Sequence, residues 1–564
     1  MEYSADGVSL KIKNAVKPLT GGVRLTGGRL KEAFDNNLAF LKRFDVDRML
    51  YWFRVHAGEP APGAPYAFGG GHFENNLHGQ TAGQFLMGAG TALLWTSDDA
   101  LRRKTDEVIA GILRFRREDG CLIPAATGEL FEKEYPNYVR AWLTFGLLAA
   151  GYAGNEQAFS LVRGFGDWFN KCGCLPYVKD LNLGFQGILA NTELYRSPVG
   201  VPADMETAQK YYREDWWLDW LDKEEQRAIY RHPGNHPHGT LLTALEAYLD
   251  LYRATGEEYL LSCVQKALRM FEDKWQHVGG GIVMCESFQG EIHYPGCNLL
   301  ESWLPYNELC CSTFWILLNQ RLHLLFPDNA HYTDEVEKSV YNMLIACQEG
   351  DQGYHYLARL EGSKDSRYTD IASCCAGTGA RLVSMLPQLL YTYTDDLVYV
   401  DLYSDSRAEI NGSEITVKTD MPYGGRVEIS LEKWAHKALK LRIPVWCAGA
   451  VTVNGQTAKP GEYLALEGLS SGESIQFELP FKVKTTLYAG REEIPGKRRY
   501  AMEYGPLLLA ALRRDNVILR YSPDSPIITE IGKGRFTLQG NHQIELRAYM
   551  DISDEPLTVY PVVE

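Results

Sequence analysis

The chain has 564 residues and a formal net charge of −15 at pH 7, with 45% hydrophobic and 23% charged residues. This composition is that of a globular protein, and the length requires more than one hydrophobic core. The acidic balance argues against nucleic acid or an anionic membrane as the main partner.

The N-terminal residues 7–16 alternate between apolar and polar side chains, which predicts a β-strand that joins a later sheet. No basic stretch followed by an apolar one is present there, so the sequence predicts no signal peptide and favours a cytoplasmic location. Uncharged runs such as residues 141–155 are shorter than a membrane span and are typical of buried helices.

From about residue 28 to residue 388, apolar side chains recur at three- and four-residue spacing, the pattern of packed helices. The clearest segments are residues 30–43, 79–94, 98–116, 137–153, 239–254 and 257–274. Gly154 and Gly256 separate consecutive segments, where glycine can supply the left-handed residue that ends a helix. Many paired helices without a fixed-length repeat predict a helical toroid, the (α/α)6-barrel class.

The period changes near Asp395 to short alternating strands separated by turns. Asn454 and Gly455 form the dipeptide that favours a tight hairpin. The predicted fold is therefore α+β and multidomain, an (α/α)6 barrel followed by β-sandwich domains.

The expected division of the chain has four parts. Residues 1–25 join a C-terminal sandwich, residues 26–392 form the catalytic barrel, residues 393–484 form a β-sandwich, and residues 485–564 form a smaller β-rich domain.

Two cysteines, Cys374 and Cys375, are adjacent in the stretch IASCCAGTGAR. Adjacent cysteines rarely bridge each other, because the resulting ring is strained. In a cytosolic protein such a pair is a buried apolar filler, a redox pair or two ligands of one metal ion.

A second cysteine motif, YNELCCS, contains Glu308 and Cys310 at the start of a helical pattern. Together with Cys374 and Cys375 these residues make a Cys₃Glu set, which suits a tetrahedral Zn²⁺ ion. The spacing is not that of a zinc finger, so buried apolar cysteines remain the alternative.

Other candidate residues lie in loops. Glu286 follows a glycine run, and a carboxyl group in a desolvated aromatic pocket can act as a general acid. Histidines in Gly- and Asn-rich loops could bind a sugar, although they more often cap helices: His72, His78, His232, His236 and His238. Aromatic residues make up 12% of the chain, as is common where carbohydrate clefts are lined with them.

Taken together, these motifs resemble glycoside hydrolase family 127, the β-L-arabinofuranosidase-like proteins, over nearly the whole chain. The family carries Glu-x-Cys after a tyrosine, matched by Tyr306, Glu308 and Cys310. It also carries Cys-Cys ahead of Ala-Arg, matched at residues 374–381, and Glu-Ser-Phe upstream, matched at residues 286–288.

The resemblance implies a retaining glycosidase with a cysteine nucleophile. Cys374 would attack the anomeric carbon, and Glu286 would be the general acid and base. The implied cofactor is Zn²⁺, with Glu308, Cys310, Cys374 and Cys375 as its ligands; metal-bound thiols are deprotonated.

The resemblance also implies sugar contacts at His238, Glu337 and Tyr356. Gln80 and Gln84 stand where relatives tend to have the histidines of a Gly-His-x-x-Gly-His motif, so the sugar pocket is expected to differ. The implied substrate is an oligosaccharide or glycoside that ends in a β-L-arabinofuranose, a related pentofuranose or a modified plant-glycan sugar.

Two other readings stay open at this point. One is a different sugar-active enzyme on a helical toroid, an epimerase or a lyase, which would not depend on Cys374. The other is a catalytically lapsed carbohydrate-binding protein with a structural zinc. A homodimer is compatible with the sequence, which offers no test of it.

Overall fold

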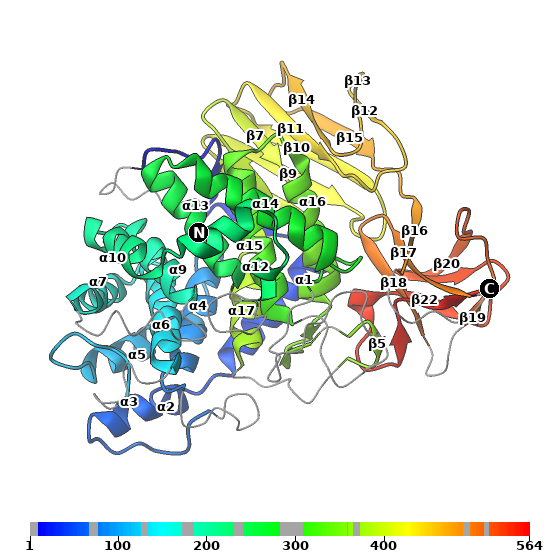
Figure 1. The fold of residues 1–564 in the computed structure, drawn as a ribbon. Coiled ribbons are helices and arrows are strands. Elements are labelled where there is room, and N and C mark those ends of the chain that lie inside the picture. The colour runs from blue at the N-terminus through cyan, green and yellow to red at the C-terminus, as the bar shows by residue number, and fades with distance from the viewer. Residues whose placement is uncertain are drawn as a thin grey trace.

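The computed structural model describes residues 10–66, 77–125, 134–171, 185–230, 239, 241–282, 308–357, 359–364, 373–488, 497–512 and 518–564. A helical region comes first and β-rich regions follow it, which confirms the predicted fold class (Figure 1). None of the helices in these ranges combines the length and apolar character needed to cross a membrane.

The described α-helices are α1 (Gly28–Lys42), α2 (Val46–Met49), α3 (Tyr51–His56), α4 (Gln80–Ala92), α5 (Asp99–Arg114), α6 (Glu134–Tyr152), α7 (Glu156–Lys171), α9 (Phe185–Tyr195), α10 (Pro202–Tyr212), α11 (Asp215–Asp222), α12 (Arg227–Tyr230), α13 (Leu241–Thr255), α14 (Glu258–Lys274), α15 (Leu309–Leu325), α16 (Ala330–Ser339) and α17 (Cys374–Ser384).

Helices of two kinds follow one another along the chain. In α5 the buried residues include Leu101, Val108 and Ile112, on one helical face, and α7 and α14 are amphipathic in the same way. By contrast, α4, α13 and α15 are buried almost all round. Because a helix with one polar face belongs at the surface and one without belongs inside, these helices form the outer and inner layers of a helical barrel.

Two inner helices, α4 and α6, approach each other through glycines. A Cβ atom on Gly146 would lie 2.3 Å from the carbonyl oxygen of Gly83, and one on Gly83 would lie 2.6 Å from the carbonyl carbon of Trp142. The backbones can come this close only because neither glycine has a side chain.

Gly146→Ala is therefore expected to lower the free energy of unfolding by about 1–3 kcal/mol, because the helices must separate to admit a methyl group. The matched control is Gly164→Ala in α7, where a Cβ atom would meet nothing within 4 Å. That substitution should raise stability by about 0.4–1 kcal/mol, since alanine loses less backbone entropy on folding. Urea denaturation of both variants measures the difference, and equal effects would contradict it.

The strands that follow the barrel, with the N-terminal strands that join them, are β1 (Lys17–Pro18), β2 (Val23–Leu25), β6 (Tyr391–Tyr393), β7 (Leu397–Val400), β8 (Ser406–Ile410), β9 (Ser413–Thr419), β10 (Arg426–Lys433), β11 (Ala438–Ile443), β12 (Val451–Val453), β13 (Gln456–Ala458), β14 (Glu462–Glu467) and β15 (Ser474–Glu478).

These strands form two five-stranded sheets, in the orders β1-β6-β7-β11-β14 and β15-β10-β9-β8-β2, and a separate β12–β13 hairpin. The hairpin turns at Asn454 and Gly455, both with positive φ, which confirms the hairpin predicted from this dipeptide. The N-terminal segment does add strands to the sheets, but they are β1 and β2 rather than the described part of the alternating stretch 7–16.

The remaining strands are β3 (Gln348–Glu349), β4 (Gly353–Tyr354), β5 (Glu361–Gly362), β16 (Val483–Leu487), β17 (Arg498–Tyr504), β18 (Leu507–Leu512), β19 (Ile518–Leu519), β20 (Ile528–Gly532), β21 (Arg535–Leu538), β22 (Glu545–Ala548), β23 (Leu557–Thr558) and β24 (Val562–Val563).

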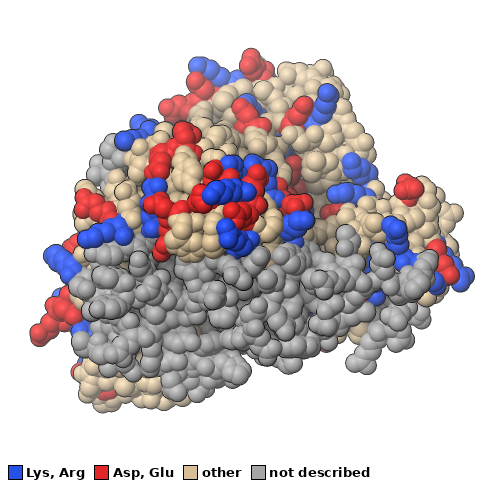
Figure 2. All heavy atoms as spheres, in the orientation of Figure 1, with Lys and Arg blue, Asp and Glu red and all other residues tan. Residues whose placement is uncertain are grey.

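All of these except β3 and β4 belong to one ten-stranded sheet. Its strands β16–β24 are drawn in orange to red at the C-terminal end of Figure 1, and β5 is drawn in green. The sequence pattern predicted that the first sandwich ends at Lys484. This residue lies inside β16, and β16 pairs with β17 of the ten-stranded sheet. On the face shown in Figure 2, acidic and basic side chains are interspersed over the described surface, without the single-sign patch that a polyanion would require.

Candidate active site

The adjacent cysteines Cys374 and Cys375 begin α17. The hydroxyl of Ser373 accepts a hydrogen bond from the backbone N–H of Ala376 at 3.0 Å and so caps the helix. Both thiols therefore lie in the first helical turn, where free backbone N–H groups and the helix dipole favour negative charge.

The other motif also lies at the start of a helix. Glu308 is the residue that precedes α15, and Cys310 lies in its first turn. Glu308 forms an antiparallel bridge with Leu357, and the N–H of Leu309 donates to the carbonyl of Tyr356 at 3.0 Å. This bridge fixes the start of α15 and places Tyr356 beside it.

The structure brings Glu308, Cys310, Cys374 and Cys375 together, with one ligand atom of each within 4.8 Å of the others. The Sγ atom of Cys375 lies 3.3 Å from that of Cys310 and 3.9 Å from that of Cys374. The Oε1 atom of Glu308 lies 3.6 Å from Cys375 Sγ and 3.8 Å from Cys374 Sγ. A tetrahedral zinc ion with Zn–S bonds of about 2.3 Å separates its sulfur ligands by roughly 3.8 Å, so the spacing fits.

The electrostatics of the cluster also fit a cation. All four residues are buried. Burial raises the pKa of Cys310 well above its usual value, and the neighbouring Cys374 and Glu308 add to this shift. Burial likewise raises the pKa of Cys375, together with the adjacent Cys310 and Cys374. Thiols in such a place become thiolates only if a positive charge compensates them, and a metal ion supplies that charge.

Two hydroxyl groups border the cluster. The Tyr356 OH lies 3.2 Å from Cys374 Sγ, so this predicted sugar contact is next to the predicted nucleophile. The Thr378 Oγ1 lies 3.4 Å from Cys310 Sγ and donates to the carbonyl of Cys374 at 3.1 Å. The sequence prediction missed Thr378, although its position four residues after Cys374 on one helix was the available signal.

The two predicted pocket glutamines, Gln80 and Gln84, lie in α4. Both side chains are buried, at 0% and 3% exposure. Gln84 packs against Gly377, where a Cβ atom would lie 2.6 Å from its Cδ, so it stands directly behind the Cys374–Cys375 turn. Among the described residues, the Gln80 amide and the Gln84 Nε2 atom have no hydrogen-bond partner.

Glu337, the one remaining predicted site residue that the structure describes, is not among the residues of the cluster. The carboxylate of Glu337 is bound by Arg442 at 2.5 Å and by the indole N–H of Trp446 at 2.7 Å, at the junction of the barrel with the sandwich. Glu286 and His238 lie outside the described residues.

The same holds for three of the four other loop histidines, His72, His232 and His236. The fourth, His78, stacks on Trp52 with ring centroids 3.6 Å apart.

Comparisons with known proteins indicate the family of the chain. The family profile "Beta-L-arabinofuranosidase, GH127 catalytic domain" matches residues 22–388, and "Beta-L-arabinofuranosidase, GH127 middle domain" matches residues 397–481. Among curated protein sequences, none matches the chain.

Solved structures share the fold. A GH127 β-arabinofuranosidase superposes with a TM-score of 0.76 at 18% identity, covering 98% of this chain and 98% of that one. A GH127 β-L-arabinofuranosidase from Geobacillus stearothermophilus T6 gives a TM-score of 0.68 at 18% identity, covering 96% of this chain and 100% of that one. Since the catalytic-domain profile spans most of its length, the chain belongs to the GH127 family of glycoside hydrolases.

Proposed function

We propose that the protein is a retaining, exo-acting glycosidase in which Cys374 is the nucleophile. The observation that carries the proposal is the buried cluster of Glu308, Cys310, Cys374 and Cys375 at the starts of α15 and α17. A thiolate is a strong nucleophile, and the two helix N-termini favour it at this position.

These four residues would hold Zn²⁺, which when bound would keep the cluster's thiols deprotonated. In the first step Cys374 Sγ forms a bond to the anomeric carbon while the glycosidic C–O bond breaks. Glu286 donates the proton that the leaving oxygen takes up. In the second step Glu286 takes a proton from water, whose oxygen displaces the sulfur and restores the original configuration.

The substrate that we propose is a β-L-arabinofuranoside or a related pentofuranoside, as in the names of the structural relatives. Tyr356 would contact the sugar beside the nucleophile. The buried amides of Gln80 and Gln84 have hydrogen-bonding groups without partners among the described residues, and these could bind sugar hydroxyls. On the family resemblance alone, His238 is a further candidate sugar contact. Glu337 is not proposed as one, because Arg442 and Trp446 bind both of its carboxylate oxygens.

We propose a cytoplasmic location, because a reducing environment protects thiols from oxidation. The eight described cysteines are all buried and none forms a disulfide: Cys121, Cys263, Cys310, Cys311, Cys347, Cys374, Cys375 and Cys447. Cysteines outside disulfides are typical of reducing compartments.

The test is metal content together with turnover. Elemental analysis should find about one zinc per chain, and Cys310→Ser should lose most of it, because a closed four-ligand site loses a ligand. Cys347→Ser, also a buried cysteine but outside the cluster, should keep the metal. A chain without metal that still cleaves arabinofuranosides would contradict the zinc site.

Turnover is followed with an aryl β-L-arabinofuranoside and related aryl pentofuranosides. The first-formed sugar should have the β configuration in proton NMR spectra taken within the first minutes of reaction. Inversion would refute the cysteine nucleophile. Saccharide binding without any turnover would instead favour a catalytically inactive carbohydrate-binding protein. The presence of Gln80 and Gln84, where relatives tend to have histidines, is the observation behind this alternative.

A further inference from the structure

A cavity lies where the barrel meets both β-rich regions. It has a volume of about 830 Å³, within the roughly 300–1,000 Å³ of small-molecule sites. Its walls come from the end of α14 and the turn after it, from α16, from Trp446 after β11, and from β16 and β17. None of its described lining residues belongs to the cysteine cluster, and the cavity is called the junction pocket below.

Each carboxylate in the walls of the junction pocket forms an ion pair with a basic side chain. The pairs are Glu272 with His331, Asp273 with Lys274, Asp334 and Glu337 with Arg442, Glu335 with Lys338, and Glu503 with Lys484. A ligand therefore meets closely spaced donors and acceptors rather than a strong field of one sign, which favours a neutral polar molecule over an ion.

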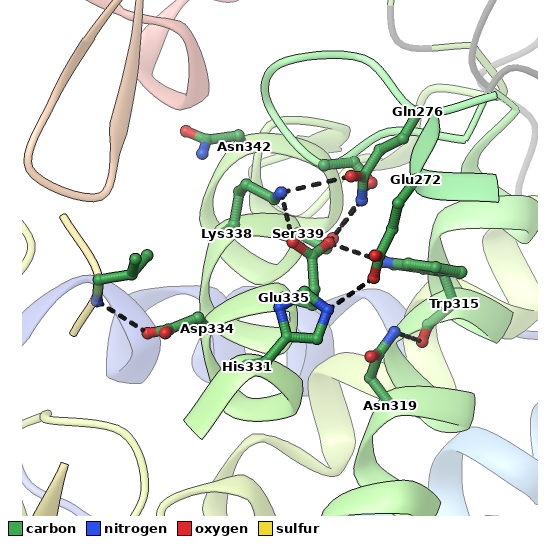
Figure 3. Close-up of polar contacts among 12 residues, drawn as sticks. Glu272, Gln276, Trp315, Asn319, His331, Asp334, Glu335, Lys338, Ser339 and Asn342 are labelled. Atoms are coloured by element: carbon green, nitrogen blue, oxygen red, sulfur yellow. Dashed lines mark hydrogen bonds and ion pairs between the residues drawn. The ribbon is translucent and has the colours of Figure 1, made fainter. Parts of the chain in front are cut away.

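Glu335 is a wall residue whose side chain is fixed by several hydrogen bonds. Its carboxylate accepts hydrogen bonds from Gln276 at 2.5 Å, Lys338 at 2.5 Å and the indole N–H of Trp315 at 3.1 Å, so it is held from three sides (Figure 3). Because these residues come from the turn after α14, from α16 and from α15, the wall is preformed.

Within the described part of the chain, one buried side chain of the junction pocket lacks a hydrogen-bond partner. His277 is 3% exposed, and among the described residues neither of its ring nitrogens has a hydrogen-bond partner. Its backbone is fixed, since its N–H donates to Gly281 at 2.8 Å and its carbonyl accepts from Gly280 at 2.9 Å. Buried polar groups are nearly always hydrogen-bonded, so a partner from outside the chain is expected here.

The chemistry of His277 defines the partner. Burial lowers the pKa of His277 to about 3, so the ring is neutral at ordinary pH. A neutral imidazole offers one donor and one acceptor, and a hydroxyl group can satisfy either of them.

Apolar surface lies beside the polar wall. Trp446 and Tyr488 are half-buried there, and Leu487 is 40% exposed and Val445 is 58% exposed. Aromatic and aliphatic faces next to convergent polar groups suit a molecule with both C–H faces and hydroxyl groups.

We propose that the junction pocket is a second, non-catalytic binding site for a neutral saccharide unit, whose hydroxyls hydrogen-bond the ring of His277. The site would bind a distant part of the glycan whose end is cleaved at Cys374. Only this last statement rests on the proposed function, because saccharide binding in the pocket does not require turnover.

Binding is tested on the full chain carrying Cys374→Ser, so that no turnover occurs. The probes are L-arabinose, D-galactose and a neutral arabinogalactan oligosaccharide, with D-galacturonate as the charged comparison, all followed by saturation-transfer NMR and calorimetry. His277→Phe removes both ring nitrogens, and Thr486→Trp fills the cavity from its β16 wall. The matched control is Thr457→Trp, which lies on the exposed β13 hairpin.

The expected result is that both pocket substitutions weaken oligosaccharide binding at least tenfold, while Thr457→Trp leaves it within twofold. Unchanged binding in both pocket variants, or a preference for D-galacturonate, would overturn the proposal. In the enzyme with Cys374 intact, Thr486→Trp should reduce release of sugar from the polymer severalfold and leave small aryl glycosides unaffected. If no glycoside is cleaved but oligosaccharide binding is still weakened by His277→Phe, the proposed function is refuted and the proposed saccharide site is supported.

Discussion

Replacing Cys374 by serine is expected to lower hydrolysis of an aryl β-L-arabinofuranoside by on the order of a thousandfold or more, because the residue would supply the bond-forming atom. Serine is nearly isosteric with cysteine, but its hydroxyl stays protonated where a thiol can ionise. The Sγ atom of Cys374 also contacts Tyr356 and Glu308, so the substitution changes the centre of the cluster. Initial rates at saturating substrate measure the loss.

The control must separate a nucleophile from a mere metal ligand. Cys263→Ser changes a buried thiol in α14 that is not part of the cluster, and it should leave both rate and zinc content unchanged. Zinc is measured in the same preparations of Cys374→Ser. If Cys374 is only a metal ligand, the activity of Cys374→Ser should fall in proportion to its zinc content. If Cys374 is the nucleophile, the variant molecules that still contain zinc should also be inactive. Cys374→Ser that retains tenfold-reduced activity or better would remove Cys374 from the nucleophile role.

Much of the candidate site could be predicted because its residues are close neighbours in the sequence and form short motifs. Cys374 and Cys375 are adjacent, and Glu308 and Cys310 are two residues apart, so each pair is placed by a single helix start. Three thiols and a carboxylate are typical zinc ligands, so the residue types indicate that the two pairs could bind one metal ion. The fold class was similarly accessible, because helical and alternating periodicities differ along the chain.

Contacts between distant segments were not accessible in this way. The bridge from Glu308 to Leu357 places Tyr356 beside Cys374, but no local pattern encodes a pairing across 49 residues. Hydrophobic periodicity shows which face of a helix is buried and does not show against which other element it packs. The junction pocket is the extreme case, since its walls come from parts of the chain that are hundreds of residues apart.

Glu337 illustrates the same limit at a single residue. The family resemblance marks it as a sugar contact, whereas its two carboxylate oxygens are bound by Arg442 and Trp446. From these contacts we expect Glu337→Gln to lower stability and to leave the KM for an aryl glycoside within twofold. A large rise in KM at unchanged stability would restore the role as a sugar contact.

The largest expected loss of stability comes from Arg442→Met. Arg442 lies in β11, has 0% exposure, and binds Asp334 and Glu337 of α16 at 2.5 Å each. Removing it leaves two buried carboxylates without their cation, and breaking a buried pair in this way costs about 3–5 kcal/mol. Urea denaturation should show this loss. The control Arg426→Met removes a 72% exposed arginine paired with Asp420, and it should change stability by less than about 0.5 kcal/mol.

The pH dependence of that loss follows from the buried carboxylates. Burial raises the pKa of Asp334 to about 6 even though Arg442 opposes the shift, and loss of the arginine should raise it further. A carboxyl group whose pKa is higher in the folded state than in the unfolded state stabilises the fold at low pH, and this contribution is lost as the pH rises through the folded value. The deficit of Arg442→Met should therefore be smaller at pH 5 than at pH 8. A deficit that is equal at both pH values would show that the carboxylates relax into solvent, and that Arg442 does not hold the barrel and the sandwich together through them.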